Sequence, residues 1–363
     1  MEAIPLGKTG KKISVDSKLG RYSVNVSANT RDLQTAISGE DLFFLCDSQI
    51  VNLYESELSS LLERGPKVEI LADEKTKSIE SIPLIVDEMI NKGIKRGAKL
   101  VVIGGGITQD IGCFIATTLF RGLRWTFVPT TLLAQADSCI GSKSSINLLG
   151  HKNIVGTFYP PEEIFICPAF LDSLSEVEIR SGIGEMLKVH MLDSYDSFQL
   201  IAKSYNHLLC DRTVLADFIE RSLLIKKRYI EEDEFDNGVR NLLNYGHSFG
   251  HAIEAATNFG IPHGIAITLG MDMANFISGE INLGNRDLFE SSHPILKLNY
   301  HGYQCHPIDF EQFRSALQRD KKNKKQKLTL ILPNKDNKLE KVFLDKTPEF
   351  WNYCQTYLGV VRT

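Results

Sequence analysis

The segment at residues 98–106 constrains the fold of this 363-residue chain more than any other feature. It begins with AKLVVI, an apolar run of strand length without the polar alternation expected of a strand that has one face in water, and it ends in three glycines. Such a strand is typical of a parallel sheet covered by helices on both faces. Further apolar runs at 41–46 and 67–71 alternate with helical periodicity at 81–96. The first half of the chain is therefore predicted to be an α/β domain.

Helical periodicity dominates the chain from about residue 173 onward. It is clearest at 181–192, 213–231, 241–256 and 266–277, and one late strand is expected at 327–332. We therefore expect two domains: an α/β domain at residues 1–174 and a mainly helical domain at residues 175–363.

Composition excludes several classes of protein. Hydrophobic residues make up 43% of the chain, and a formal net charge of −4 gives no general attraction to nucleic acid. No apolar run is long enough to span a bilayer, and the first residues lack the apolar core of a signal peptide, so a cytoplasmic protein is expected. The seven cysteines are scattered without CxxC spacing, which indicates reduced thiols and not a disulfide framework or a zinc ribbon.

Three of the nine histidines lie within seventeen residues and suggest a metal site. On a helix, His247 and His251 project from one face, with Glu254 on the same stripe. The spacing is not HExxH, which argues against a zinc protease, and a third ligand must come from elsewhere. His263 is one candidate, and Glu185, an acid within an apolar and small stretch, is another. The alternative is that these are core histidines with surface partners.

Loops after the expected strands carry groups suited to anionic ligands. The glycines at 104–106 lie where a strand turns into a helix, whose amino terminus favours a pyrophosphate, although the spacing is not GxGxxG. Residues 129–138 (PTTLLAQADS) follow another expected strand at 125–128. Lys143 and Lys152 lie among Gly, Ser and Asn residues, which favours phosphate binding over a solvated surface.

Arg240 and Lys226 are candidates for binding an anionic substrate. Arg240 precedes Asn244 by four residues and His247 by seven, so one continuous helix would place all three on one face. The spacing fits ordinary surface pairs with the acidic run at 231–234 equally well.

Taken together, the motifs resemble those of 3-dehydroquinate synthases and their sugar-phosphate cyclase relatives. The matching segments occur in family order over roughly residues 40–335. They are GGG-x-x-x-D ending at Asp110, PTTLLAQ-x-D at 129–137, G-x-K-x-x-x-N at 141–147, KN at 152–153, G-x-x-E-x-x-K at 182–188, R-x-x-L-N-x-GH-x-x-GHA-x-E at 240–254 and HG at 263–264. The double-histidine motif with its upstream Arg and Asn is highly specific.

The resemblance implies a fold and an activity. The fold would be a Rossmann-like, parallel-sheet NAD-binding domain followed by a mainly helical metal-binding domain, in a homodimeric lyase that uses NAD and a divalent metal ion, zinc or cobalt. The reaction would convert 3-deoxy-D-arabino-heptulosonate 7-phosphate to 3-dehydroquinate and phosphate. It proceeds by transient oxidation, phosphate elimination, re-reduction and intramolecular aldol closure. The protein would then serve the shikimate pathway of aromatic amino acid biosynthesis.

The resemblance also implies roles for individual residues. The metal ligands would be Glu185, His247 and His263. The NAD contacts would be Asp47, Glu74, Lys77, Gly105, Gly106, Asp110, Thr130, Thr131 and Ser173. The substrate phosphate would be bound by Lys143, Asn153, Asn244, His251 and Lys321 or Lys322, with Lys152 nearby and Arg121 from the second subunit. Lys226 and Arg240 would pair with the substrate carboxylate, and Asp137 and Lys188 would bind ring hydroxyls. Catalysis would depend on His251, Lys143, Asp137, Lys188 and Asn244.

Some positions depart from the family pattern and keep alternatives open. Gln109 replaces a usual Gly, Ser144-Ser145 replaces Thr-Gly, Cys167-Pro168 replaces Asp-Thr, and Ile265 replaces Glu after the His-Gly pair. These departures suggest a divergent cyclase acting on another sugar phosphate in secondary metabolism. Arg240 and Asn244 argue against this, because 2-deoxy-scyllo-inosose synthases differ there and carry Glu at the equivalent of Asn244.

Two further readings fit less well. A metal-dependent polyol dehydrogenase of the same fold would share the GGG loop but matches the GHxxGHAxE segment less closely. A non-catalytic relative would be expected to have lost at least one of Glu185, His247, His251 and His263, and all are present.

Overall fold

The computed structural model describes residues 12–27, 29–320, 322–323 and 327–363. The chain forms two compact units. The first contains the described residues up to Ser175 together with Ile219–Phe235, and the second contains Glu176–Phe218 and Asp236–Thr363. A second domain that is continuous from residue 175 is the expectation from the sequence. The structure differs from this expectation at helix α9 (Arg212–Glu232), because the later part of the helix belongs to the first unit.

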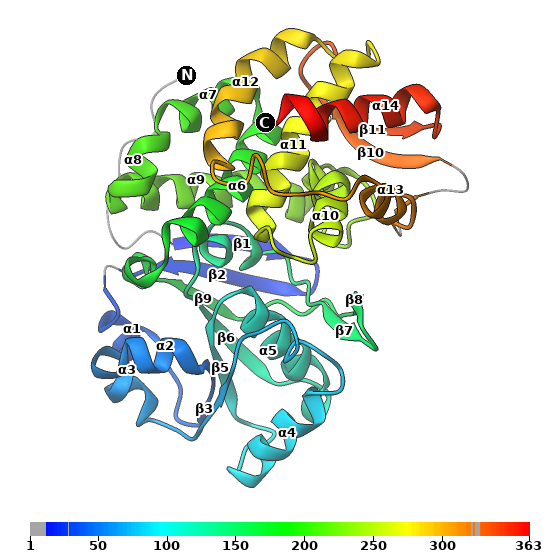
Figure 1. Cartoon of the computed structure of the whole chain (residues 1–363). Coiled ribbons are helices and arrows are strands. Elements are labelled where there is room, and N and C mark those ends of the chain that lie inside the picture. The colour runs from blue at the N-terminus through cyan, green and yellow to red at the C-terminus, as the bar shows by residue number, and fades with distance from the viewer. Residues whose placement is uncertain (1–11, 28, 321, 324–326) are drawn as a thin grey trace. The chain divides into compact units, whose positions relative to one another are not determined.

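A seven-stranded sheet in the order β1-β2-β9-β6-β5-β3-β4 forms the centre of the first unit (Figure 1). Its strands are β1 (Lys12–Ser17), β2 (Gly20–Val26), β3 (Leu42–Asp47), β4 (Lys67–Ile70), β5 (Lys99–Gly104), β6 (Arg124–Pro129) and β9 (Glu163–Ile166). Neighbouring strands are parallel except in the β1–β2 hairpin. The predicted α/β unit with a mostly parallel sheet is confirmed, although β1, β2 and β9 were not among the predicted strands.

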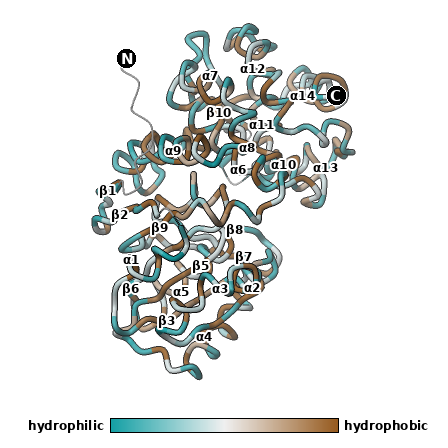
Figure 2. The backbone as a smooth tube through the Cα atoms, turned by 90° about the vertical axis from the view of Figure 1, so that its left-hand side faces the viewer, coloured by the Kyte–Doolittle hydropathy of each residue, from teal (hydrophilic) through white to brown (hydrophobic). Residues whose placement is uncertain are grey.

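Helices cover both faces of this sheet, as the fully buried strand β5 required. Val101 and Ile103 belong to a hydrophobic cluster with residues of α1 (Asp32–Ala36), α2 (Ser48–Leu53) and α3 (Glu55–Leu62). Val102 points to the other face, where α5 (Gly106–Thr118) packs so closely that a Cβ on Gly112 would lie 2.5 Å from the valine Cγ2 atom. Hydrophobic stretches run through the strands of this unit (Figure 2).

Shorter elements complete the first unit. They are α4 (Ile82–Asn91), η1 (Leu119–Arg121), η2 (Ala134–Ser138), the hairpin of β7 (Ile146–Leu148) and β8 (His151–Val155), and η3 (Pro168–Ser173).

The second unit is mainly helical, as predicted. Its helices are α6 (Glu176–Asp193), α7 (Tyr195–Lys203), α8 (Tyr205–Cys210), η4 (Val239–Asn244), α10 (His247–Ala256), α11 (His263–Glu280), α12 (Arg286–Asn299), α13 (Phe310–Gln318), α14 (Pro348–Thr356) and η5 (Tyr357–Val361). The predicted late strand is β10 (Leu328–Pro333), and it pairs with a strand that was not predicted, β11 (Leu339–Leu344).

The helix predicted at 241–256 is interrupted. Helix η4 ends at Asn244, and Gly246 has a φ of 76°, so α10 begins only at His247. A left-handed φ is incompatible with a continuing right-handed helix. The expectation that Arg240, Asn244 and His247 share one helical face is therefore wrong.

Glycines bring the backbones of α6, α10 and α11 into direct contact. A Cβ on Gly264 would lie 1.8 Å from the carbonyl oxygen of Ser181, and a Cβ on Gly184 would lie 2.2 Å from that of Gly264. On the other side of α11, a Cβ on Gly270 would lie 2.1 Å from the carbonyl oxygen of Gly246. Any side chain at these positions would force the helices apart.

No helix in the described part of the chain is long and apolar enough to cross a membrane.

We expect Gly270→Ala to destabilise the protein by about 1–3 kcal/mol, because the added methyl group overpacks the contact between α10 and α11. The melting temperature should fall by roughly 2–4 °C for each kcal/mol. Gly359→Ala is the matched control, since a Cβ there meets no atom within 4 Å. Equal melting temperatures for the two variants would contradict the close contact.

Candidate functional site

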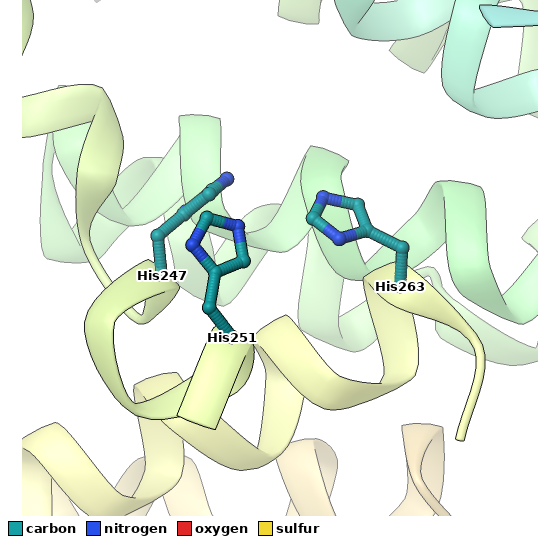
Figure 3. A group of neighbouring side chains, drawn as sticks. All are labelled: His247, His251 and His263. Carbon is teal, nitrogen blue, oxygen red and sulfur yellow. The ribbon is translucent and has the colours of Figure 1, made fainter. Parts of the chain in front are cut away.

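Three imidazoles converge at the amino termini of α10 and α11 (Figure 3). His247 is the first residue of α10, His251 lies one turn later, and His263 is the first residue of α11. One ring nitrogen of each histidine lies within 4.8 Å of those of the other two. The predicted helical spacing of His247 and His251 is confirmed, and the chain brings His263 to the same place.

Glu185 of α6 lies beside two of these imidazoles. Its side chain is only 1% exposed, and its Oε1 atom lies 3.3 Å from Nε2 of His263 and 3.8 Å from Nε2 of His247. The Oε2 atom accepts a hydrogen bond from Lys188, whereas Oε1 faces the two imidazoles without a hydrogen bond of good geometry to the described residues. A buried polar atom without a partner is costly and is normally satisfied by a bound ligand or water.

The spacing of these atoms fits a single cation. Donors that bind a metal ion tetrahedrally at about 2.1 Å lie about 3.4 Å from one another, close to the two separations of Oε1 from the imidazoles. One carboxylate and two imidazoles form a donor set suited to zinc or a similar divalent ion. Glu185, His247 and His263 therefore fit the metal site expected from the sequence.

The outer nitrogens of both candidate ligands are oriented by acceptors. The Nδ1 atom of His263 lies 3.2 Å from Oε1 of Glu254, and Nδ1 of His247 lies 3.2 Å from the carbonyl oxygen of Tyr245. Each interaction fixes the ring with Nε2 toward Glu185, which is the usual arrangement around a metal-binding histidine. Glu254 was placed on the α10 stripe by its spacing, but the sequence did not indicate that it supports His263.

The negative charges around His263 favour a positive charge on its imidazole. Burial lowers the pKa of this imidazole, but its interactions with Glu185 and Glu254 outweigh burial and raise the pKa to about 10. Burial raises the pKa of Glu185, and the charges of Lys188 and the imidazoles reverse this and lower it well below its usual range. A metal ion would replace the proton of His263 as the neutralising charge.

The other two imidazoles are held neutral. Burial, together with the charge of Lys188, lowers the pKa of His247 well below its ordinary value, and neutral imidazole is the form that binds a metal ion. Burial and the charge of Lys322 lower the pKa of His251 to about 4. His251 forms no hydrogen bond with the described residues.

The second unit also contains polar groups that are expected to bind substrate. Lys188 is buried next to Glu185, and Arg240 is buried in η4. Asn244 ends η4 and donates to the carbonyl oxygen of Asn241 over 3.0 Å. Lys322 lies 3.8 Å from Asp320. Lys321, the other residue expected at this position, lies outside the described residues.

In the first unit, the residues expected to contact NAD follow the carboxyl ends of five neighbouring strands, β4, β3, β5, β6 and β9. Parallel strands end at a common edge, which is where such sheets bind dinucleotides. The residues are Asp47 at the end of β3, Glu74 and Lys77 after β4, Gly105, Gly106 and Asp110 after β5, Thr130 and Thr131 after β6, and Ser173 after β9.

The turn between β5 and α5 fits a pyrophosphate. A Cβ on Gly105 would lie 2.9 Å from Cγ2 of Thr131, so only glycine allows this approach. No side chain in the described part of the chain caps the amino terminus of α5, which leaves its first N–H groups for an anion. The buried Oγ1 of Thr130 has no hydrogen-bond partner among the described residues, as a hydroxyl awaiting a ligand would.

Lys77 connects this edge to a residue expected at the phosphate site. Its Nζ atom lies 3.2 Å from Oδ2 of Asp110 and donates to Oδ1 of Asn153 over 3.0 Å. Burial raises the pKa of Asp110, and the charge of Lys77 opposes this shift. Asp110 also accepts from the backbone and hydroxyl of Ser145, one of the departures from the family pattern. Lys152 lies farther out, 3.7 Å from Glu74.

Lys226 is paired differently from the expectation. Its Nζ atom lies 2.8 Å from Oδ1 of Asp137, another residue expected to bind substrate, and both side chains are mostly buried. Beside this pair, Gln109 forms two hydrogen bonds with Ser138. Arg121 is exposed at the end of η1, and among the described residues no hydrogen bond or ion pair links it to the other expected ligands.

Comparison with known proteins gives consistent matches over most of the chain. The family model 3-dehydroquinate synthase N-terminal matches residues 67–181, and 3-dehydroquinate synthase C-terminal matches residues 182–323. A 3-dehydroquinate synthase of Dictyoglomus turgidum is 35% identical over 338 residues, which cover 91% of this chain and 94% of that protein.

Two solved structures share the fold. A 2-deoxy-scyllo-inosose synthase complexed with carbaglucose-6-phosphate, NAD+ and Co2+ has a TM-score of 0.86 at 23% identity, covering 96% of this chain and 100% of that one. A 2-epi-5-epi-valiolone synthase of Streptomyces hygroscopicus with NAD+ and Zn2+ bound has a TM-score of 0.82 at 24% identity, covering 95% and 98%.

We expect His263→Ala to lose the metal ion, because it removes one of the three converging donors. Elemental analysis after dialysis should find zinc in the wild type and little in the variant. His207→Ala, at an exposed position of α8, should retain its metal. Full occupancy in His263→Ala would refute the ligand assignment.

Glu254→Ala should bind zinc about 10- to 100-fold more weakly than the wild type, because the His263 ring loses the acceptor that orients it. Competition with a zinc-binding dye measures this affinity directly. Glu254→Gln keeps an oxygen acceptor and should fall between the two, and Glu290→Ala, at an exposed position of α12, serves as the control. An unchanged affinity in Glu254→Ala would show that Glu254 does not support the site.

Proposed function

The chain belongs to the 3-dehydroquinate synthase family, and we propose that it converts 3-deoxy-D-arabino-heptulosonate 7-phosphate to 3-dehydroquinate and phosphate. One observation supports this proposal most strongly. The second unit contains the buried Glu185 beside two oriented imidazoles, and it also contains a buried arginine, Arg240. The arginine suits a substrate that carries a carboxylate. The relative that is 35% identical over most of the chain is itself a 3-dehydroquinate synthase.

The proposed cofactors are NAD and one divalent metal ion, zinc or cobalt. Structural relatives contain NAD+ together with Co2+ or Zn2+, and the donor set and the β5–α5 turn of this chain fit both groups. When bound, the metal ion would polarise the reacting oxygen as a Lewis acid, and NAD would accept and return a hydride. The chain would regenerate NAD in each turnover, so no separate redox partner is required.

The residues of the chain would bind and orient the substrate. Glu185, His247 and His263 would hold the metal ion, while Lys188 and Asp137 would bind ring hydroxyls. His251, which forms no hydrogen bond with the described residues, has a ring nitrogen able to take or give a proton. Fixing the reacting groups in this way lowers the entropic part of the barrier.

The phosphate and the carboxylate of the substrate would be bound by separate groups. The donors for the phosphate group would be Lys143, Asn153, Asn244 and Lys322. Phosphate would leave after oxidation of a substrate hydroxyl to a ketone has acidified the neighbouring C–H bond. Arg240 offers the planar, two-pronged geometry that a carboxylate prefers. Lys226 could help Arg240 to bind the carboxylate only if its ammonium group broke its ion pair with Asp137 or contacted both carboxylates at once.

We further propose a homodimer in which Arg121 of the partner subunit completes the phosphate site, and a role in the shikimate pathway. The exposed position of Arg121, which has no hydrogen bond or ion pair with the other expected ligands that the structure describes, supports its availability to a second copy.

A divergent cyclase acting on another sugar phosphate is the second candidate. The observation that favours it is the pair of hydrogen bonds between Gln109 and Ser138, which places a bulkier side chain beside Asp137 than the family pattern has.

We expect the wild type, with NAD and zinc, to release phosphate from 3-deoxy-D-arabino-heptulosonate 7-phosphate many times over without net NADH. Its kcat/KM should exceed that on sedoheptulose 7-phosphate, which lacks the carboxylate. In Arg240→Leu, kcat/KM on the heptulosonate should fall about a hundredfold, because losing a charged partner costs about 2–3 kcal/mol. The kcat/KM of Arg240→Leu on sedoheptulose 7-phosphate should fall far less.

Arg96→Leu is the matched control for this assay, because Arg96 is exposed. A wild-type preference for sedoheptulose 7-phosphate would contradict the carboxylate assignment and favour the divergent cyclase. Stoichiometric accumulation of NADH with a simple polyol would instead indicate a dehydrogenase.

A further inference from the structure

Glu234 is a buried carboxylate outside all the ligand sets described above. It follows the end of α9, within the segment that belongs to the first unit, and it is 1% exposed. Its Oε1 atom accepts hydrogen bonds from the hydroxyl of Ser142 and, over 2.6 Å, from that of Ser17. Its Oε2 atom accepts from the backbone N–H of Lys18 over 2.6 Å. Charge-assisted bonds of this kind are the strong ones in a buried setting.

These bonds hold a loop in an unfavourable backbone conformation. Ser142 has a φ of 61° and follows Gly141, whose φ is 114°. The N–H of Gly141 donates to the hydroxyl of Tyr22 over 3.1 Å, which holds the loop from a second side. A residue other than glycine persists in the left-handed region only where its surroundings fix it, so the bond to Glu234 helps to determine the path of the loop.

The next residue in that loop is Lys143. Besides the bond of Glu234 to Ser142, a chain of aromatic contacts connects the end of α9 to this lysine. The Nζ atom of Lys143 lies 5.8 Å from the ring centroid of Phe158, within the range of a cation–π contact. Phe158 in turn packs edge to face against Phe235, with ring centroids 5.2 Å apart. Two consecutive residues after α9 thus contact the serine before Lys143 and the ring beneath its ammonium group.

We propose that Glu234 is a positioning residue that holds Lys143 in place for the phosphate group of the substrate. It acts through Ser142, while Phe235 supports the same lysine through Phe158. This inference rests on the proposed function, in which Lys143 binds phosphate. A lysine displaced by even about 1 Å from its productive position forfeits much of its contribution.

The test is the binding of inorganic phosphate to the full-length protein supplied with NAD and zinc, measured by titration calorimetry. The dissociation constant should rise about tenfold in Glu234→Gln, because the amide cannot accept all the bonds made to the carboxylate. Lys143→Met should weaken binding at least as much. In the Lys143→Met background, Glu234→Gln should change the affinity less than about twofold, since the group it positions is gone.

Glu232→Gln is the matched control, because the same change at the exposed end of α9 should leave phosphate affinity unchanged. Equal weakening by Glu234→Gln in both backgrounds would overturn the proposal, since the residue would then act independently of Lys143. Unchanged affinity in Glu234→Gln would overturn it as well. If Lys143→Met binds phosphate normally, the phosphate role of Lys143 itself fails, and the inference fails with it.

Ser142→Ala keeps the measurement decisive if Glu234→Gln does not fold. It removes only the bond between the loop and Glu234 and leaves the bonds from Ser17 and Lys18 in place. Its phosphate affinity should match that of Glu234→Gln, about tenfold weaker than the wild type. Wild-type affinity in Ser142→Ala would refute the path through Ser142.

Discussion

The close contact of helices α6, α10 and α11 is the constraint on which the candidate metal site depends. A methyl group at Gly184, Gly246 or Gly264 would lie within 3 Å of an atom of another of these helices, so their backbones nearly touch at these glycines. Side chains next to such a contact have little distance to cover before they meet. Each proposed metal ligand is the chain neighbour of one of these glycines: Glu185, His247 and His263.

The electrostatics of the site follow from that packing. Because Glu185 is buried at the contact, its charge must be balanced there, and Lys188 on the same helix balances only one oxygen. Glu254 adds a second negative charge behind His263. Together these groups favour a cation at the point where the imidazoles meet, which a purely structural cluster of core histidines would not require.

Local patterns in the sequence predicted the local structure well. The largely apolar run at 98–103 correctly predicted a strand buried on both faces, and the four-residue spacing of His247 and His251 correctly predicted a shared helical face. The break at Gly246 could not be predicted, because a glycine occurs both within helices and at their ends. In the structure Gly246 has a φ of 76° and lies against α11, where a Cβ would be 2.8 Å from the carbonyl oxygen of Ile267. The bonds of Lys226 to Asp137 and of Glu234 to Ser142 and Ser17 join residues 89, 92 and 217 positions apart. The later part of α9 likewise belongs to the first unit although residues of the second unit precede it in the chain. No periodicity or spacing encodes such contacts. The residues themselves offered Glu185 and His263 as candidate ligands, and only the family resemblance selected these two with His247 as the ligand set.

The most direct test of the central claim is the zinc K-edge X-ray absorption spectrum of the zinc-loaded protein without substrate. We expect two imidazole nitrogens and oxygen donors at about 2.0–2.1 Å from the zinc ion, with no sulfur. If the Glu185→Gln variant lacks one of the oxygen donors fitted around the zinc ion in the wild type, Glu185 is the source of that oxygen. A spectrum that requires three imidazoles in the wild type, and does not change in Glu185→Gln, would contradict the account. It would instead indicate that His247, His251 and His263, which also lie within reach of one ion, form the metal site.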